Sequence, residues 1–362
     1  MLILAIDLGK FKSVACLFTS PDAEQQFHTV NSEPDQFRKL IRLTSPDIVI
    51  FETCTAAGWV ADLCDVMKVD YRVANPSGEA WRWKNVKRKT DRDGALKLAR
   101  LFHMGELPTV YMPPFDVRAK RSLLKFRESV VSQRVSIQNE IRAVFHAQGM
   151  TVDRGAALWT KQGFEMMERE SRDLLECGPE AFWRGQLKLL IASYRHIEAQ
   201  ERLVNRKLDH LAKADVNITR LMTIPGVGRC TAEVICAYIG DAKRFRNSRE
   251  VSSYAGMVPS QYQSGEQDRR GRITKRGPQL LRKRLVECSW LLLRYNPWGQ
   301  QLHAKISRGQ KTRKKQAAVA VGRRLLVRCW AMLRDETDWD TTLAKAQPPT
   351  TKQATTTHST AG

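Results

Sequence analysis

The chain has 362 residues, which is too many for one small hydrophobic core, so we expect two or three domains. Its 60 lysine and arginine residues outnumber 38 aspartates and glutamates, and the resulting net charge of +22 favours a nucleic-acid partner. No apolar run approaches the roughly 20 residues of a membrane-spanning helix, and the first residues lack the basic start of a secretory leader. These features argue against a membrane or secreted protein, and we expect a soluble one in the cytoplasm, associated with the nucleoid. The eight cysteines are far apart and form no C-x-x-C pair, so we expect reduced core thiols and no zinc site.

The first 113 residues alternate strand and helix patterns around two carboxylates. The apolar run that starts at Leu2 ends at Asp7, and the run 48–51 ends at Glu52. An acid at a strand end is commonly satisfied by a lysine or by loop amides, but two such acids on core strands together indicate a metal site. The pattern predicts a mixed α/β sheet with a ribonuclease H-like order of elements, as in RuvC-type nucleases. The expected strands are 2–7, 14–18, 26–30, 47–52 and 71–74, and the expected helices are 34–43 and 58–67.

A basic block that contains two tryptophans occupies residues 81–93 and becomes acidic at its end. Its candidate nucleic-acid contacts are Lys87, Arg88 and Lys89. A helix is expected from residue 95, with Thr90 or Asp91 in place to cap it. Charge runs are usually solvated loops, but here the acids open a helix near the expected metal site. Asp91 is therefore a third candidate ligand.

Two long helical patterns follow, at about 117–145 and 181–211, with apolar residues spaced by threes, fours and sevens. They predict an antiparallel coiled-coil arm within residues 114–216, whose apolar stripes serve packing. The intervening segment, 151–179, is expected to be irregular. Because a two-helix arm buries little surface alone, we expect a homo-oligomer, either a dimer or a tetramer.

The third region, residues 217–340, is expected to be mainly helical. Gly226 and Gly228 stand before a helix and can present backbone N–H groups to a phosphate, as in helix-hairpin-helix modules. Ser264 precedes Gly265 in a loop rich in arginine, where a serine can reach a phosphodiester, although most turn serines have no catalytic role. The nearby cations are Arg269, Arg270, Arg272, Lys275 and Arg276. Residues 341–362 have no apolar period and are expected to be disordered.

Eight short motifs occur in order along the chain: Asp7, Glu52-Thr53, Asn75-Pro76, Lys89-Thr90-Asp91, Ile224-Pro225-Gly226-Val227-Gly228, Tyr254-Ala255-Gly256, Ser264-Gly265 and Ile273-Thr274-Lys275-Arg276-Gly277. Together they resemble the DEDD-type transposases of the insertion-sequence 110 family, which are related to the Piv invertase. The resemblance covers the chain to about residue 333. It implies a RuvC-like domain, a coiled-coil arm and a C-terminal domain that supplies a nucleophilic serine. It also implies recombination guided by a structured RNA that the element encodes.

Our first hypothesis is accordingly a DNA transposase that acts on element ends and a target. In it, Asp7, Glu52 and Asp91 hold Mg²⁺ or Mn²⁺. Ser264 attacks the phosphodiester and keeps the broken end covalently attached.

One position departs from the family pattern, T-D-x-x-D-A, in which a second aspartate stands three residues after the first. This chain has Gly94 at that position and an aspartate one residue earlier, Asp93. Residues two apart on a helix point in different directions, so Asp93 cannot simply replace the missing acid. Either three carboxylates suffice, or Asp93 turns in from a frayed first turn, or the protein binds nucleic acid without cutting it.

Three other functions compete with the first hypothesis. A nucleic-acid-binding protein with an inactive centre, or a RuvC-like structure-specific nuclease, fits the charge equally well. An actin-like ATPase or sugar kinase also opens with a strand that ends in D-L-G, here Asp7 to Gly9. Such enzymes need later glycine-rich loops, where this chain has long helices.

Overall fold

The computed structural model describes residues 1–20, 22–76, 78, 90–153, 155–264 and 267–340. The chain forms two compact units, Met1–Ala119 and a second that begins at Lys120. The expected tail at 341–362 lies outside the described residues, as do Lys87, Arg88, Lys89 and Gly265.

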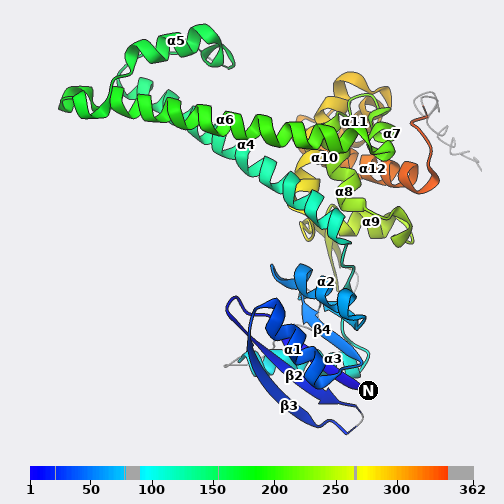
Figure 1. Ribbon diagram of the computed structural model, residues 1–362. Helices are drawn as coiled ribbons and strands as arrows, with labels where there is room; N and C mark the ends of the chain where they lie inside the picture. Colours follow the sequence, from blue (N-terminus) through cyan, green and yellow to red (C-terminus); the bar gives the residue numbers. More distant parts are fainter. Residues whose placement is uncertain (21, 77, 79–89, 154, 265–266, 341–362) are drawn as a thin grey trace, which may run out of the picture. The chain divides into compact units, whose positions relative to one another are not determined.

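The first unit is a six-stranded mixed sheet in the order β3-β2-β1-β4-β5-β6 (Figure 1). β1 pairs antiparallel with β2 but parallel with β4, and β4 is parallel with β5. The strands are β1 Leu2–Asp7, β2 Lys12–Thr19, β3 Gln25–Asn31, β4 Ile48–Glu52, β5 Asp70–Ala74 and β6 Thr109–Val110. The helices are α1 Pro34–Thr44, α2 Ala57–Met67 and α3 Asp91–His103. This confirms the predicted mixed α/β sheet; the two-residue strand β6 was not predicted.

Apolar side chains on alternate positions of the strands build a core on each face of this sheet. Leu4 and Ile6 of β1 pack with α1 and α2, whereas Ile3 and Ala5 of the same strand pack with α3. The central strands read as continuous apolar runs because both of their faces are covered.

The second unit contains two long helices, α4 Phe115–Ala147 and α6 Phe182–Lys213, that lie side by side (Figure 1). Lys120 pairs with Asp215 just beyond α6, and Arg127 with Asn205. Arg134 pairs with Glu201. Partner numbers fall as α4 numbers rise, so the helices are antiparallel. This antiparallel packing agrees with the prediction; supercoiling of the pair stays a prediction.

The segment between these helices is more ordered than predicted. It contains a 3-10 turn, Ala157–Trp159, and the helix α5 Lys161–Glu170, which Thr160 caps through a bond from Gly163 N–H to its Oγ1. Trp159 stacks on Tyr194 of α6, with ring centroids 5.0 Å apart. Met167 of α5 is buried, and Phe164 and Met166 pack against the same core. The expectation of an irregular segment was wrong.

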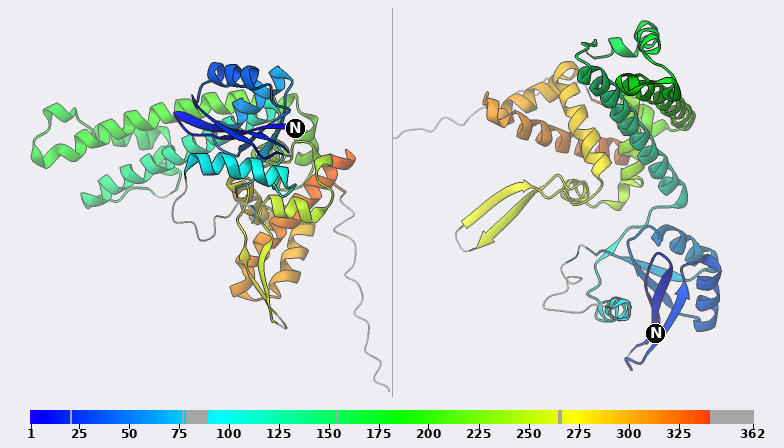
Figure 2. Two further views of the ribbon diagram at one scale, coloured as in Figure 1. Left: turned by 90° about the horizontal axis from the view of Figure 1, so that it is seen from below. Right: turned by 90° about the vertical axis from the view of Figure 1, so that its left-hand side faces the viewer.

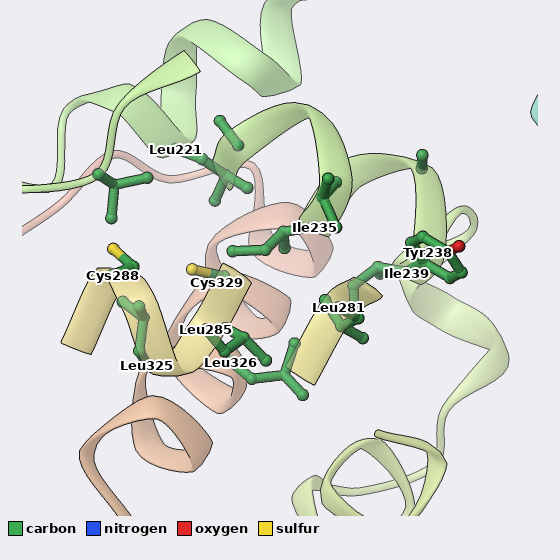
Figure 3. Packing of buried hydrophobic residues seen from close by; sticks show 14 of the residues in the cluster. Leu221, Ile235, Tyr238, Ile239, Leu281, Leu285, Cys288, Leu325, Leu326 and Cys329 are labelled. Carbon is green, nitrogen blue, oxygen red and sulfur yellow. The ribbon is translucent and has the colours of Figure 1, made fainter. Parts of the chain in front are cut away.

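The remaining helices of this unit enclose the largest core. Leu285 and Cys288 of α10 face Leu325 and Cys329 of α12, with Ile235 of α8 beside them (Figure 3). The elements here are α7 Val216–Met222, α8 Arg229–Ile239, α9 Ser248–Tyr254, β7 Pro259–Ser264, β8 Gln267–Ile273, α10 Gln279–Tyr295, α11 Pro297–Ser307 and α12 Lys314–Asp335. The prediction of a mainly helical C-terminal region is confirmed.

All eight cysteines are free thiols, four of them buried. Burial raises the pKa of Cys64 to about 12 and that of Cys288 to about 11. Cys54 contradicts the expectation of core thiols, because it is exposed in the loop between β4 and α2. None of the described helices combines the length and the apolar character that crossing a bilayer requires.

Glu233 of α8 is a buried carboxyl group within this core, only 1% exposed. Neither of its side-chain oxygens has a hydrogen-bond partner among the described residues. The guanidinium of Arg229 lies 3.5 Å from Oε1 and also pairs with Asp209. Burial raises the pKa of Glu233 above its usual value, and the charges of Arg229, Arg127 and Lys120 oppose this only in part. The folded protein therefore holds this proton more tightly than the unfolded chain does.

We expect Glu233→Gln to increase the free energy of unfolding at pH 7. The stability that the raised pKa contributes is fully present below the unfolded pKa of a glutamate and is lost as the pH rises through the folded value. Glutamine cannot ionise, so the variant does not lose this stability as the pH rises. Its gain in free energy of unfolding over the wild type should therefore shrink as the pH falls toward 4. Thermal unfolding at pH 4 and pH 7 measures it, with the exposed Glu140→Gln as the control for loss of one charge. An equal gain at both pH values would contradict the assignment.

Candidate active site

Asp7 and Glu52 end neighbouring parallel strands at the carboxyl edge of the sheet. Ile6 is paired with Phe51, so the two acids occupy the next row of the same ladder. Neighbouring strands lie about 5 Å apart. Side chains alternate along a strand, and Ile3, Ala5, Ile48 and Ile50 all lie in the core on the α3 face. Asp7 and Glu52 therefore share that face, and both are partly exposed.

Helix α3 brings its first turn against Asp7. A Cβ atom at position 94 would overlap Asp7 Oδ2 and lie 3.1 Å from Asp7 Cγ. Only glycine allows this approach without moving Asp7. Asp91 is the first residue of the helix and is exposed. Position 94, where the family pattern has its last acid, is thus in direct contact with Asp7, the first acid of that pattern.

Asp93 is held at the start of the helix by a capping box. Its Oδ2 accepts from the Thr90 N–H at 3.0 Å and from the Thr90 hydroxyl at 2.7 Å, and its own N–H donates to Thr90 Oγ1 at 3.3 Å. Thr90 is one of the two caps that the sequence predicted, and Asp91, the other, is the first residue of the helix. The first turn is not frayed, so Asp93 would have to leave these bonds to reach Asp7. Its predicted catalytic role stays a prediction.

Carboxylate oxygens are the donors that Mg²⁺ and Mn²⁺ prefer, so Asp7, Glu52 and Asp91 suit such an ion chemically. Among the described residues, however, no three Asp, Glu, His or Cys side chains converge closely enough to enclose one. A carboxylate at position 94 would stand beside Asp7, but this chain has glycine there.

Ser264 is the last residue of β7 and belongs to the second unit. β7 and β8 form a two-stranded antiparallel hairpin (Figure 2). Ser264 pairs with Gln267 in its last described row. Ser260, earlier in the same strand, donates to the carbonyl of Arg272 at 3.1 Å. Ser264 is therefore held near the tip of the hairpin by its backbone pairing.

Two glycines let the chain cross itself at the base of this hairpin. Gly256 has φ +65° and Gly277 φ +112°; a Cβ on the first would overlap the carbonyl oxygen of Arg276, and one on the second that of Tyr254. Arg282 donates to the carbonyls of Ala255 at 3.1 Å and Gly277 at 2.8 Å, joining both ends of the hairpin. The motifs Tyr254-Ala255-Gly256 and Ile273-Thr274-Lys275-Arg276-Gly277 thus meet in space.

The cations predicted around Ser264 lie on β8 and just after it. The described side chains of this set are exposed: Arg269, Arg272, Lys275 and Arg276. Arg270 also lies on β8, paired with Gln261. Gly226 adopts φ +93° in a turn that packs on Leu292 of α10, and Gly228 is the N-cap of α8. Phosphate binding by these residues stays a prediction.

Two family models match the chain. One, for the DEDD transposases of the IS110 type, matches residues 4–150; the other, described as "Transposase IS116/IS110/IS902 family", matches residues 218–304. Together they cover more than half of the chain. The chain belongs to the IS116/IS110/IS902 transposase family. The first match contains Asp7, Glu52 and Asp91, and the second contains Ser264. Membership places the chain among DNA transposases and recombinases.

Curated relatives agree with this family. The chain is 26% identical to the transposase for insertion sequence element IS1328 of Yersinia enterocolitica, over 79% of this chain and 82% of that protein. It is 29% identical to the IS1111A transposase of Coxiella burnetii, but this alignment spans only 57% of the chain and 56% of the relative. It is also 26% identical to the pilin gene-inverting protein of Moraxella lacunata, over 70% of the chain and 69% of that protein.

Sequence reasoning missed two features of the site. The contact between Gly94 and Asp7 joins residues far apart in the chain, and no local pattern announces it. The clamp by Arg282 was also missed, because an arginine after a glycine motif reads as one more exposed cation.

Gly94→Asp should strengthen the divalent-cation response of the wild type, because it adds a carboxylate beside Asp7. In the absence of such an ion, the new carboxylate repels Asp7 and should lower the unfolding temperature below that of Gly94→Asn, the matched uncharged control. Mg²⁺ at a hundred times its Kd should then stabilise the Asp variant by about 2.7 kcal/mol. Thermal unfolding across a Mg²⁺ titration measures both effects. An equal Mg²⁺ response from the Asn variant would contradict a carboxylate pair at this position.

Proposed function

We propose that this protein is the DNA recombinase of an insertion sequence, which cuts and rejoins DNA strands through a serine nucleophile under the guidance of an element-encoded RNA. The observation that carries the proposal is the pairing of Asp7 and Glu52 on adjacent strand ends with α3 against them. Both family matches support the same class of reaction. The net charge of +22 suits the nucleic acids that such a reaction needs.

Asp7 and Glu52 would hold Mg²⁺ or Mn²⁺ at the carboxyl edge of the sheet, and the exposed side chain of Asp91 would have to move toward them to complete the site. When bound, such an ion supplies positive charge that stabilises the phosphate as charge builds on it. The N-terminal end of α3 contributes a partial positive charge beside Asp7, which offsets part of the carboxylate's charge.

Ser264 would supply the covalent step. Its hydroxyl loses a proton to a base, and the oxygen forms a bond to phosphorus while the bond from phosphorus to the departing strand end breaks. The departing oxygen takes up a proton. Because the phosphate stays attached to the serine, the energy of the broken bond is retained for rejoining to a new strand.

A nucleic-acid-binding protein with an inactive nuclease centre is the second candidate, and Gly94 is the observation that favours it. Affinity cannot separate the two candidates, since both bind through phosphate charge. Cleavage can: if the centre is crippled, Gly94→Asp should raise Mg²⁺-dependent cleavage above the wild-type rate.

Ser264→Ala should abolish the covalent protein–DNA adduct and reduce strand cleavage by about a thousandfold or more. Ser260→Ala is the matched control, because it removes a hydroxyl from the same strand that donates to the carbonyl of Arg272. Adducts trapped on element-end DNA, resolved by denaturing electrophoresis with and without the co-purifying RNA, measure the step. An adduct that survives Ser264→Ala would remove this serine from the mechanism.

We further propose that the site is shared between subunits of a homo-oligomer. The carboxylates and Ser264 belong to different compact units, and delivery of one chain's serine to another's carboxylates would keep single subunits idle. A mixture of Asp7→Ala and Ser264→Ala chains should then regain roughly a quarter to a half of wild-type cleavage, because mixed assemblies contain one intact composite site. Cleavage kinetics of co-expressed chains test this. No recovery in mixed oligomers, with an active wild-type control, would assign both halves to one chain.

A further inference from the structure

The stretch from Cys288 to Arg334 contains no acidic residue. It spans the second half of α10, all of α11 and nearly all of α12, and it carries cations throughout. These cations are Arg294, Lys305, Arg308, Lys311, Arg313, Lys314, Lys315, Arg323, Arg324, Arg328 and Arg334. A chain with 38 acids elsewhere leaves this stretch without any internal counter-charge.

Cations just before this stretch and at its last residue form ion pairs with acids, unlike the cations inside it. Lys283 pairs with Glu128 of α4, and Arg284 pairs with Glu128 at 2.6 Å and with Glu287 at 2.8 Å. At the other end, Arg334 pairs with Asp335 at 2.7 Å. Within the described part of the chain, no ion pair involves a cation between residues 294 and 328.

The densest part of the stretch is the junction of α11 and α12, which we call the basic junction: Arg308, Lys311, Arg313, Lys314 and Lys315, all exposed. Arg308 ends α11 in the left-handed conformation, at φ +50°. α12 then begins with two cations, Lys314 and Lys315, after the N-cap Arg313; its first turn has no acid, and no side chain caps it. Cations at a helix N-terminus oppose the helix dipole, so this placement costs stability and calls for an anion outside the chain.

An exposed aromatic ring adjoins the basic junction. Trp290 of α10 is 42% exposed and contacts the ring of His303, with centroids 6.2 Å apart. His303 Nε2 lies 3.3 Å from the carbonyl oxygen of Lys314, so α11 links the indole to the start of α12. A large exposed ring beside unpaired cations is the combination that binds nucleic acid through stacking and phosphate contacts.

We propose that the basic junction is a second nucleic-acid contact surface, separate from the hairpin that carries Ser264, and that Lys311, Arg313, Lys314 and Lys315 bind backbone phosphates there. The inference deepens the proposed function, on which it rests for the presence of DNA and RNA partners. Phosphates of either nucleic acid fit this surface, so the experiment uses both.

The test variant carries Lys311→Gln, Arg313→Gln, Lys314→Gln and Lys315→Gln. Its matched control loses the same charge from four scattered, exposed cations: Lys39→Gln, Arg42→Gln, Lys161→Gln and Lys207→Gln. Affinity for a 30-base-pair DNA duplex and for an RNA hairpin is measured in EDTA across a salt series, so that cleavage is not required. Four lost phosphate contacts lower the slope of log K against log salt by about 3.6 and weaken binding at least tenfold near 0.1 M salt.

The proposal expects this loss for at least one probe in the junction variant and a much smaller loss in the control. The probe that is affected identifies the partner as DNA or RNA. Equal loss in both variants would show an effect of net charge alone and would overturn the proposal, as would unchanged binding in the junction variant. A second variant, Lys314→Glu with Lys315→Glu, guards against misfolding, since acids suit the first turn of α12 and should preserve its unfolding temperature. Binding lost while cleavage is absent in every form would sink the proposed function but leave this surface standing.

Discussion

The contact between α3 and the end of β1 is the constraint on which the first unit depends. Gly94 lets the helix approach until its backbone meets the Asp7 side chain, and Ala95 and Ala99 keep the rest of the helix close to the sheet. The same approach closes the apolar core on that face. A change at position 94 therefore acts on packing and on the carboxylate site together, because both use one interface.

The elements of the first unit could be predicted because strand and helix periods are local. Asp7 and Glu52 were recognisable as acids that end apolar runs, and the cap of α3 could be narrowed to Thr90 or Asp91. The two-residue strand β6 exists only through its pairing with β5, so it leaves no usable pattern. Helix α5 was missed because it is short and mostly polar, although Phe164 and Met167 lie one turn apart and pack on the same core. The site could be predicted only as a set of residues, since the close approach of Gly94 to Asp7 arises from tertiary packing.

In the second unit, the segments that are held by close backbone contacts are not the segments that carry unpaired charge. The base of the β7–β8 hairpin is fixed by two close backbone crossings and by the clamp of Arg282, whose pKa is lowered by burial. Its strands then extend with exposed arginines. The helices likewise differ in their ion pairs. The start of α10 has cations that pair with Glu128, whereas no described ion pair involves the cations of the basic junction. The contacts that stabilise this unit thus lie where the chain packs on itself. The unpaired charges lie on segments that face solvent.

The antiparallel register of α4 and α6 limits how the length of the arm can change. The pairs from Lys120 to Asp215 and from Arg134 to Glu201 tie each position on one helix to a position on the other. One residue added to α4 alone turns every later side chain by about 100° and moves it 1.5 Å along the axis. At the far end of the arm, Trp159 would then no longer stack on Tyr194. Arms of different length should therefore differ by matched insertions in both helices, in steps near seven residues.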